Sequence, residues 1–188
     1  MKIYKRTKPK RQRKGLTNYY KRIKLVKSNL PRLVVRKTNR YIITQIILSK
    51  AGGDHTYLTV TSKELSNYGW KDSFKNTPAA YLTGLLIGIK SKKIGINKAI
   101  LDIGLHKPTK GSKVFAVAKG AIDAGLEIPI SEEVIPSEER IKGKHIEDFK
   151  LKLFGESKLA ELDYIPITSL FEKVKNNILK EIEMIKNE

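Results

Sequence analysis

The sequence predicts an α/β protein: a mixed sheet of about five strands in the order βββ-α-β-α-β with packed helices, an extended basic N-terminal arm and a helical C-terminal extension. Three β-branched segments joined by short turns lie between residues 32 and 61, and apolar helix-like and strand-like segments then alternate up to residue 130. At 188 residues the chain is long enough to bury a sizeable core. We divide it into a basic arm with a short helix (1–30), an α/β core (31–130), and an acidic connection with a C-terminal helical extension (131–188).

The arm carries charge of one sign. From Lys2 to Gly53 there is no acidic residue, and the first 40 residues hold nine lysines and seven arginines. The whole chain has 38 basic and 19 acidic residues, so this segment accounts for most of the net charge of +19. Tyrosines at positions 4, 19, 20 and 41 are interleaved with the charge. Lys and Arg neutralise phosphates and Tyr rings stack on bases, which favours a nucleic-acid ligand over a merely solvated surface or a solubilising tail.

Within the arm, residues 1–15 contain too few apolar side chains to fold alone, so we expect them to be mobile until bound. Thr17 is the predicted N-cap of a helix that runs to about Ser28. On this helix we expect Tyr20 to pack against the core, which leaves Tyr19 to stack on a base.

The core begins with three predicted strands, 32–37, 41–49 and 57–61, whose short connections require an antiparallel meander. Residues 62–76 are expected to cover one edge, with Trp70 anchoring this loop. Thr77 as N-cap and Pro78 at the first helical position predict a helix that ends at about Lys93 and is apolar nearly all round, hence buried against the sheet. In it Gly84 and Gly88, one turn apart, permit close approach of a neighbour.

The second half of the core continues with a buried strand over 98–104, a basic loop over 106–111, a helix from the cap Ser112 to Ala124, and a last strand over 126–130. From residue 121 onward the chain has 15 acidic and 10 basic residues. Residues 131–139 are expected to form an extended connection. Ser169 and Glu172 predict a capping box that opens a C-terminal helix. Its apolar stripe, expected to dock on the body, comprises Phe171, Val174, Ile178, Ile182 and Ile185.

Several classes of protein are excluded by what the sequence lacks. It has no Cys, so it has neither a disulfide nor a thiolate metal site, and its three His residues show no paired spacing. No apolar run approaches the roughly 20 residues of a membrane span. The basic start is not followed by an apolar signal core, so we expect an intracellular protein without a membrane segment.

An enzymatic function finds no support in the residues. Gly120 and Gly125 have the spacing of a phosphate-binding loop, but Leu126 and Glu127 stand where Lys and Ser or Thr are required. A two-metal nuclease needs several convergent carboxylates at strand ends, and Asp102 alone lies on a predicted strand of the core. We therefore expect no catalytic residue, no metal and no cofactor, and we expect Asp102 to be structural or incidental.

Eight motifs in order resemble the archaeal branch of the large-subunit ribosomal protein L-eighteen family. Together they extend from about residue 11 to residue 146, most of the chain. They are Arg11–Lys14, Thr17–Tyr20, Pro31–Val34, Ala80–Leu86, Ala99–Gly104, Gly111–Val117, Lys119–Leu126 and Arg140–Ile146.

The resemblance implies a structural constituent of the large ribosomal subunit, located in the cytoplasm, that binds 5S rRNA and attaches it to the subunit in the central protuberance. The implied partners are 5S rRNA, 23S-type rRNA, the large-subunit protein L-five and other central-protuberance proteins. The alternative is a sequence-independent basic RNA chaperone or nucleic-acid-compacting protein, which would show little preference among nucleic acids of equal length.

The same resemblance implies RNA contacts in three parts of the chain: the arm with its helix, the strand meander, and the loop before the second core helix. In that loop the helix N-terminus itself favours a phosphate. The expected RNA-binding residues are Lys5, Arg6, Lys8, Lys10, Arg11, Arg13, Lys14, Tyr19, Arg22 and Lys24 in the arm, Arg32, Arg36, Lys37 and Arg40 in the meander, and Lys107, Lys110 and Lys113 in the loop.

Overall fold

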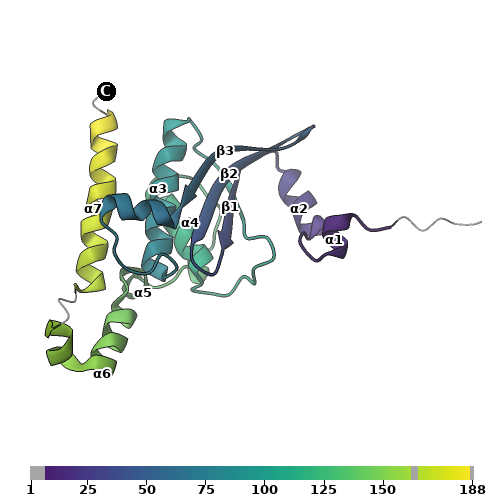
Figure 1. The fold of residues 1–188 in the computed structure, drawn as a ribbon. Coiled ribbons are helices and arrows are strands. Elements are labelled where there is room, and N and C mark those ends of the chain that lie inside the picture. The colour runs from purple at the N-terminus through teal and green to yellow at the C-terminus, as the bar shows by residue number, and fades with distance from the viewer. Residues whose placement is uncertain (1–6, 162–164, 187–188) are drawn as a thin grey trace, which may run out of the picture.

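The computed structural model describes residues 7–161 and 165–186, with side chains described for 7–155 and 165–180. In these ranges a four-stranded mixed sheet is combined with helices (Figure 1). The strands are β1 (Arg32–Lys37), β2 (Ile42–Lys50), β3 (Gly53–Thr61) and β4 (Ile100–Asp102). The helical elements are α1 (Lys10–Arg13), α2 (Tyr19–Val26), η1 (Ser62–Tyr68), α3 (Thr77–Lys93), α4 (Lys113–Asp123), η2 (Glu132–Val134), α5 (Glu138–Lys142), α6 (Lys144–Glu161) and α7 (Ile167–Lys186).

The sheet has the strand order β3-β2-β1-β4. β1, β2 and β3 form the predicted antiparallel meander, and β4 pairs parallel to β1 after the crossover through α3. The mixed α/β class is thereby confirmed, with four strands instead of five. The segment 126–130, which we expected to be the fifth strand, forms a single β-bridge, in which Glu127 pairs with Lys98. Pro129 has no amide to donate, which prevents this segment from continuing a ladder.

The core lies on one face of the sheet. Leu33 and Val35 of β1 and Ile42 and Ile46 of β2 are fully buried there beneath α3 and α4. As predicted, α3 is buried almost all round, because the sheet, α4 and α7 surround it (Figure 1). The other face carries α1 and α2 (Figure 1). None of the helices in the described part of the chain combines the length and hydrophobicity that a membrane crossing requires.

Two glycines allow the backbones of α3 and α4 to touch. A Cβ added to Gly84 would collide with the carbonyl oxygen of Val117, and one added to Gly120 would collide with the carbonyl oxygen of Tyr81. The close approach predicted from Gly84 and Gly88 is therefore confirmed, and the neighbour is α4.

Substitution Gly84→Ala is expected to lower the free energy of unfolding by about 1–3 kcal/mol, because the added methyl meets rigid backbone in a packed core. The control is Gly52→Ala, where nothing lies within 4 Å of the added Cβ. Urea unfolding of both variants measures the difference. Equal midpoints would show that α3 and α4 can separate without cost.

The C-terminal helix docks on the body as predicted. Phe171, Val174 and Ile178 are buried, and the rings of Phe171 and Tyr81 lie 5.5 Å apart. The side chains of Ile182 and Ile185 fall outside the described residues. The predicted capping box is wrong: α7 begins at Ile167, and the Ser169 hydroxyl donates to the carbonyl of Pro166. The acidic connection contains η2 and α5, and is not wholly extended.

Two helix caps and one aromatic residue also differ from the predictions. The side chain of Asn18, and not Thr17, caps α2, and Asn76 caps α3 one residue before Thr77. Tyr20 is 76% exposed, so the expectation that it packs against the core is wrong. The role of Trp70 is confirmed: it is buried and its indole NH donates to the carbonyl of Ser73 at 3.2 Å.

Candidate nucleic-acid interface

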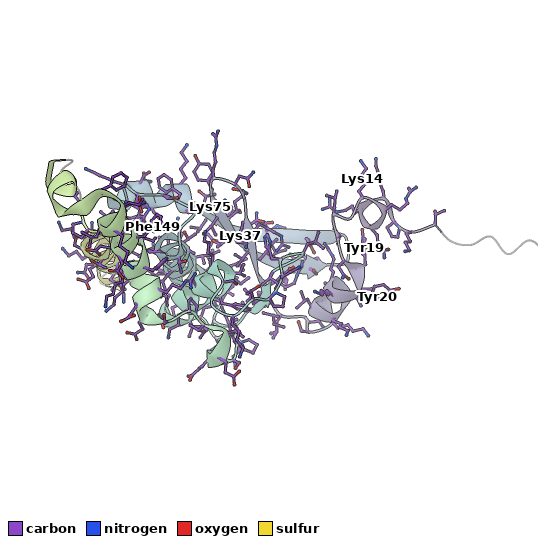
Figure 2. The ribbon with its side chains drawn as sticks, turned by 90° about the horizontal axis from the view of Figure 1, so that it is seen from below. Lys14, Tyr19, Tyr20, Lys37, Lys75 and Phe149 are labelled. Carbon is purple, nitrogen blue, oxygen red and sulfur yellow. The ribbon has the colours of Figure 1, made fainter. Side chains whose placement is uncertain are left out.

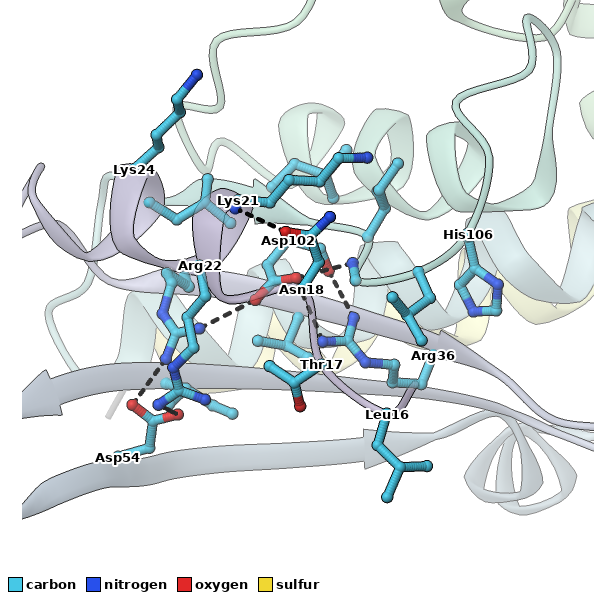
Figure 3. A pocket seen from close by; sticks show the side chains of 18 of the residues that line it. Leu16, Thr17, Asn18, Lys21, Arg22, Lys24, Arg36, Asp54, Asp102 and His106 are labelled. Carbon is cyan, nitrogen blue, oxygen red and sulfur yellow. Dashed lines mark hydrogen bonds and ion pairs between the residues drawn. The ribbon is translucent and has the colours of Figure 1, made fainter. Parts of the chain in front are cut away.

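A cleft of about 630 Å³ lies between the arm and the exposed face of the sheet (Figure 3). Its walls combine apolar side chains with cations. The apolar part includes Val34 of β1, Leu101 of β4 and Ile103, which follows β4. The cations among its lining residues are Arg11, Lys21, Arg22, Lys24, Arg32, Arg36 and Lys37.

The sequence produces this arrangement because β1 alternates. Leu33 and Val35 point into the core, which directs Arg32, Val34 and Arg36 to the opposite face. Residues in the arm then fold back over that face: Arg11 Nε donates to the Thr17 hydroxyl at 3.1 Å, and α2 follows. Six of the predicted RNA-binding residues, all in the arm and the meander, are brought together here: Arg11, Arg22, Lys24, Arg32, Arg36 and Lys37.

A chain of ion pairs crosses the floor of the cleft. Arg22 of α2 contacts Asp54 at 2.8 Å, and Asp54 contacts Arg32 at 2.9 Å. Arg32 contacts Asp102 at 3.0 Å, and Asp102 contacts Arg36 at 3.2 Å. Three guanidinium groups thus share two carboxylates, so the network retains a net positive charge.

The two carboxylates are held by further donors. The Ser49 hydroxyl donates to Asp54 at 2.7 Å, and the amide of Gly104 donates to Asp102 at 2.8 Å. Burial alone would raise the pKa of Asp54. The hydrogen bonds from Ser49 and Arg32 and the positive charges of Arg32 and Arg22 outweigh that effect, so the pKa of Asp54 is lowered. Asp54 therefore stays ionised and keeps the network intact at neutral pH.

Arg32 differs from the expectation that it faces RNA. It is 3% exposed, and its two terminal nitrogens are engaged by Asp102, Asp54 and Ser49. This assignment as a surface contact is contradicted by its burial, because the ion pairs with Asp54 and Asp102 hold the guanidinium inside the network. Its Nε is buried and lacks a hydrogen-bond partner among the described residues. Arg36 is half exposed and also donates to the carbonyls of Val35 and Asp102.

The remaining cations of the arm are on the surface. Lys8, Lys10, Arg13 and Lys14 are exposed, as is Arg40 in the turn between β1 and β2. Tyr19 is half buried, whereas Tyr20 projects from α2 (Figure 2). Lys5 and Arg6 fall outside the described residues. One helical turn, α1, occupies part of the segment that we expected to be mobile.

The three lysines of the loop before α4 do not line the cleft. Lys107 and Lys110 are exposed, and Lys110 forms a surface ion pair with Glu133 at 3.2 Å. Lys113 is half buried at the first position of α4. Ser112 is the N-cap residue of α4, as predicted, but its side chain makes no capping hydrogen bond.

Sequence reasoning missed three functional positions in the cleft. Lys21 and His106 line it, and Asp54 joins α2 to the sheet. His106 Nε2 accepts a hydrogen bond from the amide of Lys37 at 3.1 Å. Burial and then the charges of Lys37 and Arg36 lower the pKa of His106, so it is neutral at physiological pH. A signal for Asp54 was available in the sequence, because it is the first acidic residue after 53 residues that include neither Asp nor Glu.

The site provides no metal-binding chemistry. Within residues 7–161 and 165–186, no group of three or more His, Asp or Glu side chains is placed to hold a metal ion. Asp54 also lies on a strand, β3, so the expectation that Asp102 alone does so is wrong. Each of these two carboxylates is engaged by two arginines. The chemistry of the site is the binding of anions by guanidinium and ammonium groups beside apolar side chains of the cleft wall.

Comparison with known proteins shows similarity to ribosomal proteins. The family described as ribosomal large subunit proteins 60S L5 and 50S L18 matches residues 3–98 and 90–131. A large ribosomal subunit protein uL18 of Staphylothermus marinus is 46% identical over 191 residues, which cover 95% of each chain. That of Methanoregula boonei is 52% identical over 143 residues, which cover 76% of this chain and 82% of the relative. The family match includes the arm from residue 3 onward and every strand of the sheet.

Proposed function

This chain belongs to the L-eighteen family of large-subunit ribosomal proteins, in its archaeal branch, and from this premise we propose that it binds 5S rRNA and attaches it to the large subunit in the central protuberance. It is a structural constituent of the cytoplasmic ribosome and not an enzyme. The proposal therefore concerns which RNA it binds and with which surface.

The observation that carries the proposal is the cleft between the arm and the sheet. Seven cations line it, and the carboxylates on its floor are already paired. RNA offers phosphates to such cations. Its unstacked bases can pack on the apolar side chains of the cleft or stack on an exposed Tyr ring. We propose that the RNA lies across the sheet face and is held there by the arm, with Arg36, Lys37, Arg22 and Lys24 on phosphates and Tyr20 in place of Tyr19 as the stacking residue.

Competition binding tests the choice of RNA. The protein is bound to labelled 5S rRNA and challenged with unlabelled 5S rRNA or with a structured RNA of the same length. We expect the 5S competitor to displace the label at a concentration at least tenfold lower. Equal competition would support a general RNA chaperone or nucleic-acid-compacting protein in its place, since phosphate contacts alone do not discriminate between sequences.

The wider set of partners rests on family membership. We propose that 23S-type rRNA, the large-subunit protein L-five and other central-protuberance proteins contact this chain. α6 offers a surface for a protein neighbour, because Phe149, Leu153 and Phe154 are 61%, 59% and 48% exposed. Isolated apolar residues on a surface are ordinary, whereas several clustered between residues 149 and 154 of α6 indicate a contact site.

The loop before α4 is proposed to bind phosphates. Replacing Lys107, Lys110 and Lys113 together by Gln is expected to weaken binding about equally for 5S rRNA and for variants with altered loop sequences, because phosphate contacts position the RNA without reading its bases. Affinity is measured at ~150 mM salt, where a few lost phosphate contacts are still resolved. Unchanged affinity would place the loop in solvent.

A further inference from the structure

Four cations from separate parts of the chain gather at one end of the body. We name Lys37, Lys75, Lys113 and Arg140 the end surface. Lys37 is the last residue of β1, Lys75 precedes α3, Lys113 opens α4, and Arg140 lies in α5. In Figure 2 Lys37 and Lys75 lie between the arm, with Lys14, and α6, with Phe149. Two members, Lys75 and Arg140, were not among the residues expected to bind RNA.

The elements that carry these side chains are neighbours: α4 packs against α3 and β1, and α3 also packs against α5. The pKa of Lys113 is lowered, first by burial and then by the positive charges of Lys75, Lys37 and Arg140. The pKa of His145 is lowered by burial and by Arg140 and Lys113, against the opposing effect of Asp148. Like charges that act on one another in this way repel, so their proximity does not stabilise the folded state.

The nearby carboxylates do not neutralise the cluster. Asp72 is engaged by Lys150 at 3.8 Å and by the Asn76 side chain at 3.0 Å. Glu139 contacts Lys144 at 3.5 Å. Among the residues that the structure describes, none of the four cations of the end surface forms an ion pair, although other lysines on the surface do. A surface of unpaired cations attracts anions.

The end surface is continuous with the cleft. Lys37 belongs to both, and His106, which lines the cleft, accepts a hydrogen bond from the amide of Lys37. A ligand with regularly spaced negative charges can follow such a path from one to the other. RNA fits this description better than an acidic protein, because the cleft with which the surface connects is itself suited to RNA.

We propose that the end surface is a second phosphate-binding site, through which the protein holds a segment of rRNA backbone beyond the RNA gripped by the arm. The inference rests on the proposed function and extends it. With RNA on the cleft at one side and on α4 and α5 at the other, the chain can join two RNA segments in the way that attachment of 5S rRNA requires. The segment at the end surface belongs either to 5S rRNA or to 23S-type rRNA, and its phosphates are recognised in the same way.

Site-directed hydroxyl-radical cleavage tests this proposal in the assembled large subunit. The chain has no Cys, so a single introduced thiol can carry an iron chelate at one known position. Lys75→Cys and Arg140→Cys place it on the end surface, and Lys14→Cys on the arm. Lys63→Cys, on the exposed side of η1, is the matched control. We expect strong rRNA cleavage from positions 75, 140 and 14, and weak or no cleavage from position 63.

The outcomes separate the two proposals. Cleavage from position 14 without cleavage from either 75 or 140, in subunits that incorporate all the proteins equally, overturns the end surface and leaves the proposed function standing. Failure to select 5S rRNA in the competition experiment instead defeats the proposed function. Which rRNA is cut from positions 75 and 140 identifies the segment that is bound.

A charge-neutralising pair gives an independent measurement. Lys75→Gln with Arg140→Gln should reduce the slope of log affinity against log salt for the combined 5S and 23S-type rRNA by about 1.4 to 1.8, which corresponds to two lost phosphate contacts. Lys63→Gln with Lys92→Gln removes two exposed charges elsewhere and should leave the slope unchanged. Equal slopes for the two double variants contradict the proposal.

Discussion

Removal of residues 1–30 is expected to lower RNA affinity by orders of magnitude while the remaining chain still folds cooperatively. The deletion removes twelve basic residues, of which roughly half are expected to touch phosphate. Each phosphate contributes about 0.7–0.9 to the slope of log affinity against log salt. The truncated protein should therefore show a slope shallower by roughly 4 to 6.

The structure supports the expected survival of the fold. No residue of α1 or α2 is buried, and Ile23, like Tyr20, is more than half exposed. The principal ion pair between α2 and the sheet, Arg22 with Asp54, joins side chains that are 39% and 26% exposed, and such pairs contribute roughly 0–1 kcal/mol. We expect the free energy of unfolding to fall by about that amount.

Isotherms at four or five salt concentrations measure the slope for both proteins. A full-length control in which exposed arm cations are changed to Gln separates charge from chain length: Lys8, Lys10, Arg13, Lys14 and Lys24. Its slope should lie between those of the intact and truncated proteins. Parallel lines for intact and truncated protein would mean that the body alone supplies the electrostatic contacts with RNA.

Asp102→Asn is expected to destabilise the fold by about 3 kcal/mol or more, because it leaves the buried guanidinium of Arg32 with one carboxylate partner fewer. Arg32 is 3% exposed and the side chain of Asp102 9% exposed, so water cannot replace the lost ion pair. The amide of Gly104 and the guanidinium of Arg36 also lose a charged acceptor. Asp102 is therefore structural, and the alternative that it is incidental is wrong.

Urea unfolding measures this loss against Asp148→Asn, which makes the same chemical change on an exposed residue of α6. The control should stay within about 0.5 kcal/mol of the parent, as is usual for surface substitutions. At temperatures where Asp102→Asn remains folded, its RNA binding should stay close to normal. An unfolding midpoint equal to that of the control would show that the ion-pair network does not contribute to the free energy of unfolding. A metal-dependent nuclease activity that Asp102→Asn abolishes would refute the assignment of function.

The sequence by itself determined the features that depend on neighbours along the chain. The meander, the all-round apolar helix α3, the glycines at its contact with α4 and the acid-free arm are local patterns of hydrophobicity and charge. The period of the apolar residues in such a pattern indicates whether the segment forms a helix or a strand. The stripe through Phe171, Val174 and Ile178 likewise predicted the docking of α7, although not its first residue.

Only the tertiary structure decided which charges are available. Arg32 and Lys37 lie on the same strand and look alike in sequence, yet Arg32 is buried by Asp102, 70 positions away, while Lys37 is exposed. Lys75 and Arg140 become part of the end surface because α3, which follows Lys75, packs against both α4, with Lys113, and α5, with Arg140. A charge acts on its neighbours in space through solvent and protein, so its role follows from the packing of elements that are distant in the sequence.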